Sequence, residues 1–251
     1  ASDVYKRQKQ MSESLLLGAI LATVGGFLDA HTYICRGKVF ANAETGNIVL
    51  MGAKLAEGDF KDAFFYLIPI TAFACGVFCA EGIKKLFKQN NYIHWRQITV
   101  AAEIIALVFI SFVEPTRMHN IFTNALVAFV CSLQVQSFRQ ISGVPLTTTM
   151  CTGNLRSGTE HLFNAVTTKN KTVLKTAFKY YSIIFFFVLG AAIGAVLSSA
   201  IGRYSTLIAA GGLLAAFLLM FVNKEAEKRE EIFERAEEER EEAEIKAAEK
   251  L

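Results

Sequence analysis

Charged side chains are scarce over most of this chain and crowded at its end. The last 29 residues hold 12 of the 23 acidic and 7 of the 26 basic side chains, which leaves 11 acidic and 19 basic side chains in the first 222 residues. A soluble domain of this length would carry more charge along its whole sequence. The basic residues stand at the ends of apolar runs, a pattern that suits an anionic membrane surface and argues against a nucleic-acid partner.

The signatures of common catalytic and metal sites are also missing. The chain has no glycine-rich nucleotide loop and no Walker sequence, so any transport is not visibly driven by ATP. Cys75 and Cys79 lie four residues apart in an apolar run without His, Asp or further Cys nearby. They predict small buried side chains rather than a metal centre. We therefore expect no cofactor and no metal. The five cysteines are Cys35, Cys75, Cys79, Cys131 and Cys151.

The two ends of the chain differ from its apolar body. Residues 1–13 are polar and basic, and the first apolar run is too long for the core of a cleavable signal peptide, so we interpret that run as a first span. Residues 223–251 predict a charged cytoplasmic helix, because pairs such as Glu225 and Arg229 are spaced i, i+4 in the favourable order. A solvated single helix is the simpler interpretation, and a coiled coil or partner-docking helix is the alternative.

Six apolar stretches reach or approach the roughly 20 residues that a membrane-spanning helix needs. Gly190 and Gly194 form a small-xxx-small pair that predicts a close contact between helices. The fold expected for residues 14–222 is therefore an all-α, polytopic membrane helix bundle. The stretches are Ser14–Cys35, Phe64–Phe87, Ile98–Val113, Ile121–Phe138, Tyr180–Ile201 and Thr206–Val222, of which the third is short.

Basic residues concentrate in alternate connections, as the positive-inside rule requires. They precede the first span, separate the second from the third and the fourth from the fifth, and follow the sixth. This places both termini in the cytoplasm, with the bundle in a bacterial inner membrane. The residues are Lys6, Arg7, Lys9, Lys84, Lys85, Lys88, Arg96, Arg139, Lys169, Lys171, Lys175, Lys179, Lys224, Lys228 and Arg229.

Two semi-polar segments do not fit simple spans, and both contain Thr-Gly-Asn, at residues 45–47 and 152–154. Superposing the tripeptides places Asp29 on Gln136 and gives each half the same order of elements. Three spans separate the halves, so their directions are opposite. The sequence thus predicts a 3+3 inverted repeat, over about 14–114 and 119–222, with two short broken or re-entrant helices.

The tripeptides are the predicted substrate site. Glycine permits unusual backbone geometry, asparagine can bind freed backbone groups or a ligand, and threonine can cap a helix start. Two helix starts that point at one site would favour an anionic or carboxylate-bearing solute. The alternative is that each tripeptide merely caps a short interfacial helix. The predicted site comprises Thr45, Gly46, Asn47, Gln136, Arg139, Thr152, Gly153 and Asn154.

Acidic residues within spans are expensive to bury and usually functional. Asp29 lies late in the first span and Glu103 within the third. We expect these two carboxyls to couple the site to protons or another cation. Glu81 and Arg139, near span ends, are expected to reach the interface instead, and the histidines His31 and His161 to be satisfied structurally or to lie at the interface.

Six runs in this chain form a paired, ordered set of motifs: Gly25–Ala30, Val39–Asn42, Thr45–Asn47, Gln134–Arg139, Thr147–Thr149 and Thr152–Leu155. In these runs the chain resembles the YoaK-like family of bacterial membrane proteins of unknown function. The resemblance covers roughly Leu15 to Val222. Two features depart from the family pattern: Glu44 stands where an apolar residue is expected, and the charged tail is long. The family is often labelled as candidate permeases, which implies the membrane fold without naming a solute.

A secondary transporter of a small solute is the function that the sequence favours. A membrane scaffold or sensor that acts through its tail is the alternative. An enzyme is not expected, because Cys151 and the Glu160-His161 pair lack the third group that a nucleophilic site requires. The expected partners are the lipid bilayer and the solute, and the sequence leaves a homo-oligomer open.

Overall fold

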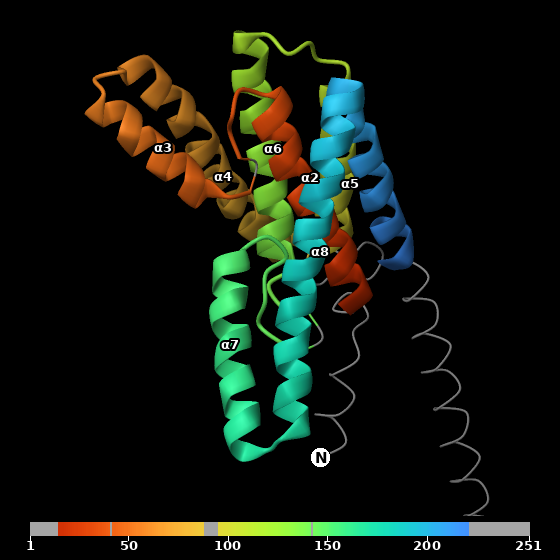
Figure 1. The fold of residues 1–251 in the computed structure, drawn as a ribbon. Coiled ribbons are helices and arrows are strands. Elements are labelled where there is room, and N and C mark those ends of the chain that lie inside the picture. Colours follow the sequence, from red (N-terminus) through yellow and green to blue (C-terminus); the bar gives the residue numbers. More distant parts are fainter. Residues whose placement is uncertain (1–14, 41, 88–94, 142, 221–251) are drawn as a thin grey trace, which may run out of the picture.

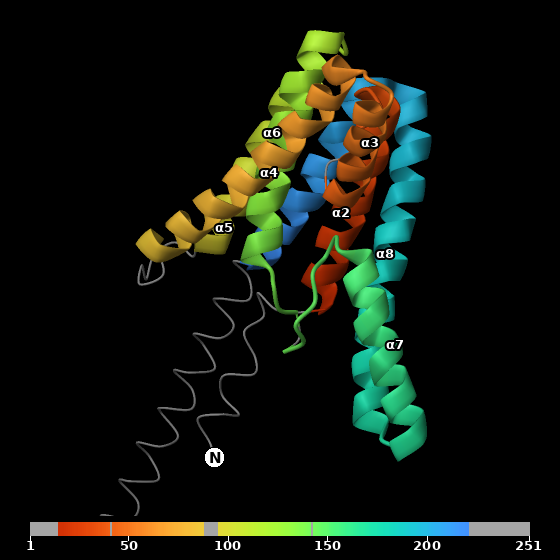
Figure 2. The same ribbon diagram turned by 90° about the vertical axis from the view of Figure 1, so that its left-hand side faces the viewer.

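The computed structural model describes residues 15–220 apart from 41, 88–94 and 142, and this part of the chain is built from α-helices (Figures 1 and 2). The predicted segments 1–13 and 223–251 lie outside the described residues. The elements are α2 (Leu15–Cys35), α3 (Glu44–Ala56), α4 (Phe60–Phe87), α5 (Trp95–Ser111), α6 (Arg117–Ser137), α7 (Cys151–Thr168), α8 (Lys171–Ile201), the 3-10 helix η3 (Gly202–Ser205) and a helix over residues 206–220.

Four helical stretches are long and apolar enough to cross a membrane: Leu15–Cys35, Phe60–Leu86, Arg117–Ser137 and Lys171–Met220. The last stretch joins the predicted fifth and sixth spans, which η3 separates. The predicted third span corresponds to α5, a helix of 17 residues that is not one of these four stretches.

Large apolar side chains remain exposed along α4 and α8, and Phe78 is 83% exposed. An apolar exterior of this kind requires a lipid or protein surround. The chain is therefore an all-α integral membrane protein, as its sequence predicts.

The long helices pack in two pairs, and each short helix packs on the long helix that follows it. α2 lies along α8 and α4 along α6, while α3 lies on α4 and α7 on α8. Both short helices begin near the middle of the bundle (Figures 1 and 2). The α3–α4 hairpin then extends towards one end of the molecule and the α7–α8 hairpin towards the other (Figure 1).

Glycines bring α2 and α8 into backbone contact. A Cβ at Gly190 would lie 2.7 Å from Cα of Thr23, and one at Gly194 would lie 2.6 Å from the carbonyl oxygen of Phe27. A Cβ at Gly26 would overlap the carbonyl group of Phe187. The close contact predicted from the Gly190–Gly194 pair is therefore confirmed, and Gly26 supplies its counterpart on α2.

Two buried clusters hold the bundle around α2. The larger one joins α2, α5, α6 and the helix over 206–220 through apolar side chains such as Leu28, Leu107 and Leu213. The smaller one seats the connection between α6 and α7 against α2 and α8. It contains Ala22, Ile141, Val144, Leu146, Tyr180 and Ile183. Thus the segment that precedes the second tripeptide is packed inside the bundle rather than lying on its surface.

Candidate functional site

The two tripeptides occupy equivalent places, in the first turns of α3 and α7. Asn47 accepts a hydrogen bond from the Phe40 N–H (3.0 Å) and donates to the Phe40 carbonyl oxygen (2.9 Å). Asn154 donates to the Thr147 carbonyl oxygen (2.6 Å) and accepts from the Thr147 N–H (3.4 Å). Each asparagine thus clamps the residue seven positions before it. We call these two arrangements the asparagine clamps.

Threonine does not cap either short helix, contrary to the expectation from sequence. The N-cap residues are Ala43 and Met150, and neither makes a side-chain cap bond. Thr45 and Thr152 follow one position inside the helices and are exposed. The asparagine clamps satisfy the backbone before each helix instead, because an amide offers both a donor and an acceptor.

The clamps predict a stability effect that separates the structural from the ligand-binding interpretation of the asparagines. Asn47→Ala and Asn154→Ala each remove two hydrogen bonds to the backbone, so each should lower the free energy of unfolding by about 1–3 kcal/mol. The measurement is the melting temperature of the purified protein in detergent without solute. The exposed controls Thr45→Ala and Thr152→Ala should leave it unchanged. Unchanged melting temperatures in both asparagine variants would contradict the clamp role.

The connections that precede the short helices converge on one turn of α2. We call residues 36–43 the first linker and residues 138–150 the second linker. In the first linker, the Asn42 N–H donates to Oδ1 of Asp29 (2.6 Å), and Nδ2 of Asn42 donates to the Gly25 carbonyl oxygen (3.3 Å). In the second linker, the Thr149 methyl group packs on Gly25, where an added Cβ would lie 3.7 Å from Cβ of Thr149. Gly25 is needed because a side chain there would displace Thr149.

The first residue of each short helix is within electrostatic range of Asp29. Glu44 opens α3 and Cys151 opens α7. Burial raises the pKa of Glu44 to about 7. The hydrogen bond from Asn47 opposes this increase, and the charge of Asp29 adds to it. Burial, with a further contribution from Asp29, raises the pKa of Cys151 to about 11. The helix starts predicted to share one site are thus both within electrostatic range of the buried Asp29 carboxyl.

Glu103 lies on the opposite side of the same region, on α5. Its side chain is 1% exposed, Oε1 accepts a weak hydrogen bond from the Cys131 thiol (3.8 Å), and Oε2 has no partner. Cys131 is within electrostatic range of both Asp29 and Glu103. One thiol of α6 is thus within electrostatic range of both predicted coupling carboxyls.

Gln136 and Arg139 lie at the end of α6 and take part in other contacts. Gln136 donates to Oε1 of Glu81 on α4, and Arg139 is exposed just beyond the helix. Within the described residues, no hydrogen bond connects either side chain to a tripeptide, or one tripeptide to the other. The eight predicted site residues therefore fall into three local groups, and the linkers rather than the tripeptides themselves meet at α2.

His31 has a structural role. It is fully buried on α2, and its Nδ1 lies 3.1 Å from Oγ of Ser198 and 2.9 Å from Oγ of Ser205. These contacts connect α2 to the end of α8 and to η3, where the chain reverses direction (Figure 1).

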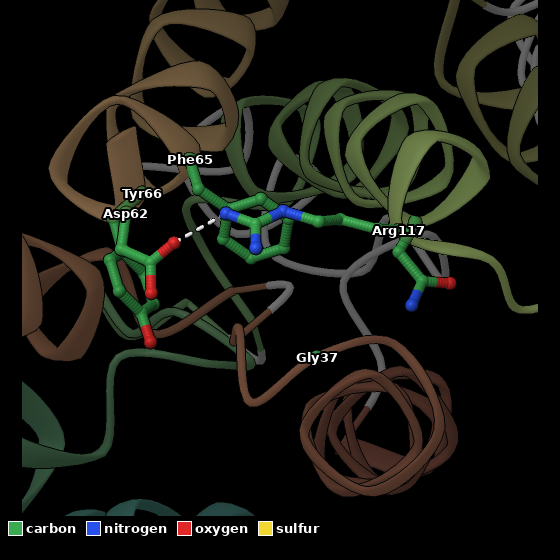
Figure 3. A pocket seen from close by; sticks show the side chains of 6 residues that line it. Gly37, Asp62, Phe65, Tyr66 and Arg117 are labelled. Carbon is green, nitrogen blue, oxygen red and sulfur yellow. Dashed lines mark hydrogen bonds and ion pairs between the residues drawn. The ribbon is translucent and has the colours of Figure 1, made fainter. Parts of the chain in front are cut away.

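A separate pocket of about 300 Å³ opens at the end of the bundle where α3 meets α4. Its lining includes Gly37, Phe65, Tyr66 and Asn120, and the Arg117 guanidinium binds Asp62 across it (2.5 Å; Figure 3). None of the residues that meet at Gly25 and Asp29 lines this pocket. The convergence of the linkers is therefore a distinct and more deeply buried place.

Comparison with known proteins identifies the family. Residues 17–220 match the model of a family described as protein of unknown function, DUF1275. The chain belongs to the DUF1275 family. The match runs from α2 through the helix over 206–220 and includes both linkers and both short helices. No curated protein and no solved structure shows a detectable similarity to this DUF1275 chain.

Asn42, Glu44 and Thr149 form, with Gly25 and Asp29, a cluster where the two linkers meet α2. These three residues were not predicted from the sequence as part of a site. A signal for each existed. Glu44 and Cys151 stand immediately before the two tripeptides, and Asn42 and Thr149 stand three residues before Thr45 and Thr152. The two residues of each pair therefore stand at the same distance before their tripeptides, and this regularity could have identified them.

Proposed function

We propose that this protein is a secondary transporter of a small solute, with its binding site where the two linkers meet α2. The observation that carries the proposal is the convergence of Asn42 and Thr149 on Gly25, one helical turn before Asp29. Non-helical backbone within a membrane bundle occurs where it is buried in protein or lines a cavity. In transporters such breaks supply the groups that bind the solute near the middle of the membrane.

An inverted repeat accounts for the packing of the helices. The proposed equivalents are α2 with α6, α3 with α7, α4 with α8, and α5 with the helix over 206–220. If each helix is replaced by its proposed equivalent, the packed pair α2–α8 becomes the packed pair α6–α4. In the same way, the α3–α4 hairpin becomes the α7–α8 hairpin. The hairpins extend towards opposite ends of the molecule, as an inverted relation requires (Figure 1). The asparagine clamps, with the same seven-residue spacing, support the same relation.

The chemistry of the site fits a small polar solute coupled to an ion. The starts of α3 and α7 present positive dipole ends, which favour an anionic group. Asp29 and Glu44 oppose that charge, so an anion would enter together with a proton or another cation. Glu103, buried beyond Cys131, is the second coupling carboxyl in this proposal. The asparagine clamps hold the linkers that shape the site.

The orientation and the membrane are part of the proposal. The connection between α7 and α8 carries Lys169, and α8 begins with Lys171, followed by Lys175 and Lys179 on its next turns. This basic end is placed in the cytoplasm by the positive-inside rule, with both termini on the same side of a bacterial inner membrane. The resemblance to the YoaK-like family, often labelled as candidate permeases, supports the transport function.

A ligand screen tests the site in the purified protein. A solute that binds only the folded state raises its melting temperature by mass action. We expect one class of small anions or metabolites to stabilise the wild type by several degrees and to stabilise Thr149→Val much less. That substitution keeps the shape of the side chain and removes a buried hydroxyl that has no partner. Thr152→Val is the exposed control. Equal stabilisation of Thr149→Val and the wild type would place the solute elsewhere.

A further inference from the structure

Glu44 lies between the exposed first turn of α3 and the buried Asp29. Its Oε2 accepts a hydrogen bond from Nδ2 of Asn47 (3.0 Å), and its Oε1 is buried without a hydrogen-bond partner. The side chain of Thr45 beside it is exposed. The carboxyl is thus fixed through one oxygen while the other oxygen remains available within the cluster.

A second unpartnered polar group belongs to the same cluster. Thr149 is only 6% exposed, its methyl group packs on Gly25, and its hydroxyl has no hydrogen-bond partner. Gly25 and Asp29 are one turn apart on α2, so the Thr149 side chain and the Asp29 carboxyl share a face of that helix. The Glu44 carboxyl, within electrostatic range of Asp29, and the unpartnered Thr149 hydroxyl thus both belong to the surroundings of one turn of α2.

The surroundings favour the state in which Asp29 and Glu44 together hold one proton. Two neighbouring carboxylates repel each other, and burial removes the water that would stabilise both charges. Asp29 on α2 is the charged group that acts on Glu44. From α7, Cys151 is within electrostatic range of Asp29, and burial raises the pKa of its thiol to about 11, so it adds no charge at neutral pH. In the first linker, the Lys38 ammonium lies 4.6 Å from the centre of the Tyr33 ring, and at the far end of α3 Lys54 binds Glu57 (2.7 Å).

We propose that Glu44 is the proton-binding group of this site, taking a proton from water on one side of the membrane and releasing it on the other. The carboxylate gains a proton, the site loses one negative charge, and the positive helix starts can then hold an anionic group. The coupling of this proton to a solute rests on the proposed transport function. The binding of the proton at Glu44 does not.

Infrared spectroscopy of the purified protein in lipid nanodiscs tests the proposal, with protons as the only ligand. As the pH rises, the wild type should lose a carboxylic-acid C=O band with a midpoint near pH 7, following the pKa of Glu44. Glu44→Gln should lack that transition, and Glu57→Gln, at an exposed ion pair, should retain it. The same transition in Glu44→Gln, or none above pH 5 in the wild type, would overturn the proposal.

Asp29→Asn provides a test that keeps Glu44 in place. Removing the charge of Asp29 should move the midpoint of the Glu44 transition to lower pH, because a negative neighbour raises the pKa of an acid. An unchanged midpoint would show that the two groups do not share a site. Because no solute is added, failure of the titration overturns the role of Glu44 alone. Absence of solute-driven proton flux in liposomes, with the titration intact, overturns the transport function alone.

The pH dependence of stability gives an independent readout. The folded state holds the Glu44 proton more tightly than the unfolded chain does, so this contribution is complete below about pH 4.5 and is lost as the pH rises through 7. The melting temperature of the wild type should therefore fall relative to that of Glu44→Gln between pH 5 and pH 8. A constant difference between the two proteins over this interval would contradict the proposal.

Discussion

Replacement of Gly26 by leucine is expected to prevent accumulation of a folded protein. A Cβ at this position would lie 2.9 Å from the carbonyl carbon of Phe187 and 3.0 Å from the amide nitrogen of Ala191, both in the backbone of α8. Backbone atoms cannot move aside as a flexible side chain can, so α2 and α8 must separate. Overpacking of a well-packed core typically costs about 1–3 kcal/mol. Separation of this central helix pair should exceed that range and approach the whole stability of the domain, which is on the order of 5–15 kcal/mol.

The measurement is size-exclusion chromatography of the detergent-solubilised protein. Gly26→Leu should elute as aggregate or be absent, and Gly26→Ala, which adds the same Cβ, should lower both the yield and the melting temperature. Gly211→Leu is the matched control, since Gly211 is exposed on the helix over 206–220 and an added Cβ would meet nothing within 4 Å. A monodisperse Gly26→Leu protein with wild-type stability would disprove the α2–α8 contact.

The apolar runs and the glycine pair were sufficient to predict the membrane bundle. Runs near 20 residues specify helices because a bilayer leaves no other partner for the backbone. Gly190 and Gly194 marked the contact between α2 and α8 because small residues allow backbones to approach. The helix boundaries differ from the predicted spans. The helix α8 begins at Lys171, nine residues before the predicted span, because a helix can continue beyond the membrane.

The offset of 107 residues that superposes the tripeptides also matches the starts of α3 and α7, but it does not match the ends of α2 and α6. Asp29 lies six residues before the end of α2, whereas Gln136, its predicted counterpart, lies one residue before the end of α6. The second linker is five residues longer than the first. Because the linkers differ in length, one constant difference in residue number cannot align both the helices before them and the helices after them. Counted from the helix ends, the residue of α6 at the place of Asp29 is Cys131, whose thiol donates to Oε1 of Glu103 (3.8 Å).

The cluster around Asp29 depends on contacts between segments far apart in the chain. Thr149 meets Gly25 across more than a hundred residues, and hydropathy carries no information on such a pairing. Glu44 stood out in the sequence as a departure from the family pattern, but its position beside Asp29 follows only from the path of the first linker. The tripeptides lie next to this cluster because the asparagine clamps hold the two linkers at the starts of α3 and α7.

Asp29→Asn is expected to abolish proton-coupled transport while preserving the fold. Asparagine keeps an oxygen at the position that accepts the Asn42 N–H, so the first linker can remain attached to α2. It removes the negative charge that acts on Glu44 and Cys151. An ionisable residue inside a membrane bundle is costly to maintain and is generally retained for function. The loss should therefore appear in the flux and not in the elution profile or the yield.

Proton flux in liposomes tests the central claim most directly. Vesicles that hold the purified protein and an internal pH-sensitive dye are exposed to a panel of small anions and metabolites. With the wild type and with the control Glu57→Gln, at least one class of solute should change the internal pH, whereas Asp29→Asn should match protein-free vesicles. Wild-type flux in Asp29→Asn, or no response of the wild type to any solute, would contradict a proton-coupled transport site at the convergence of the two linkers.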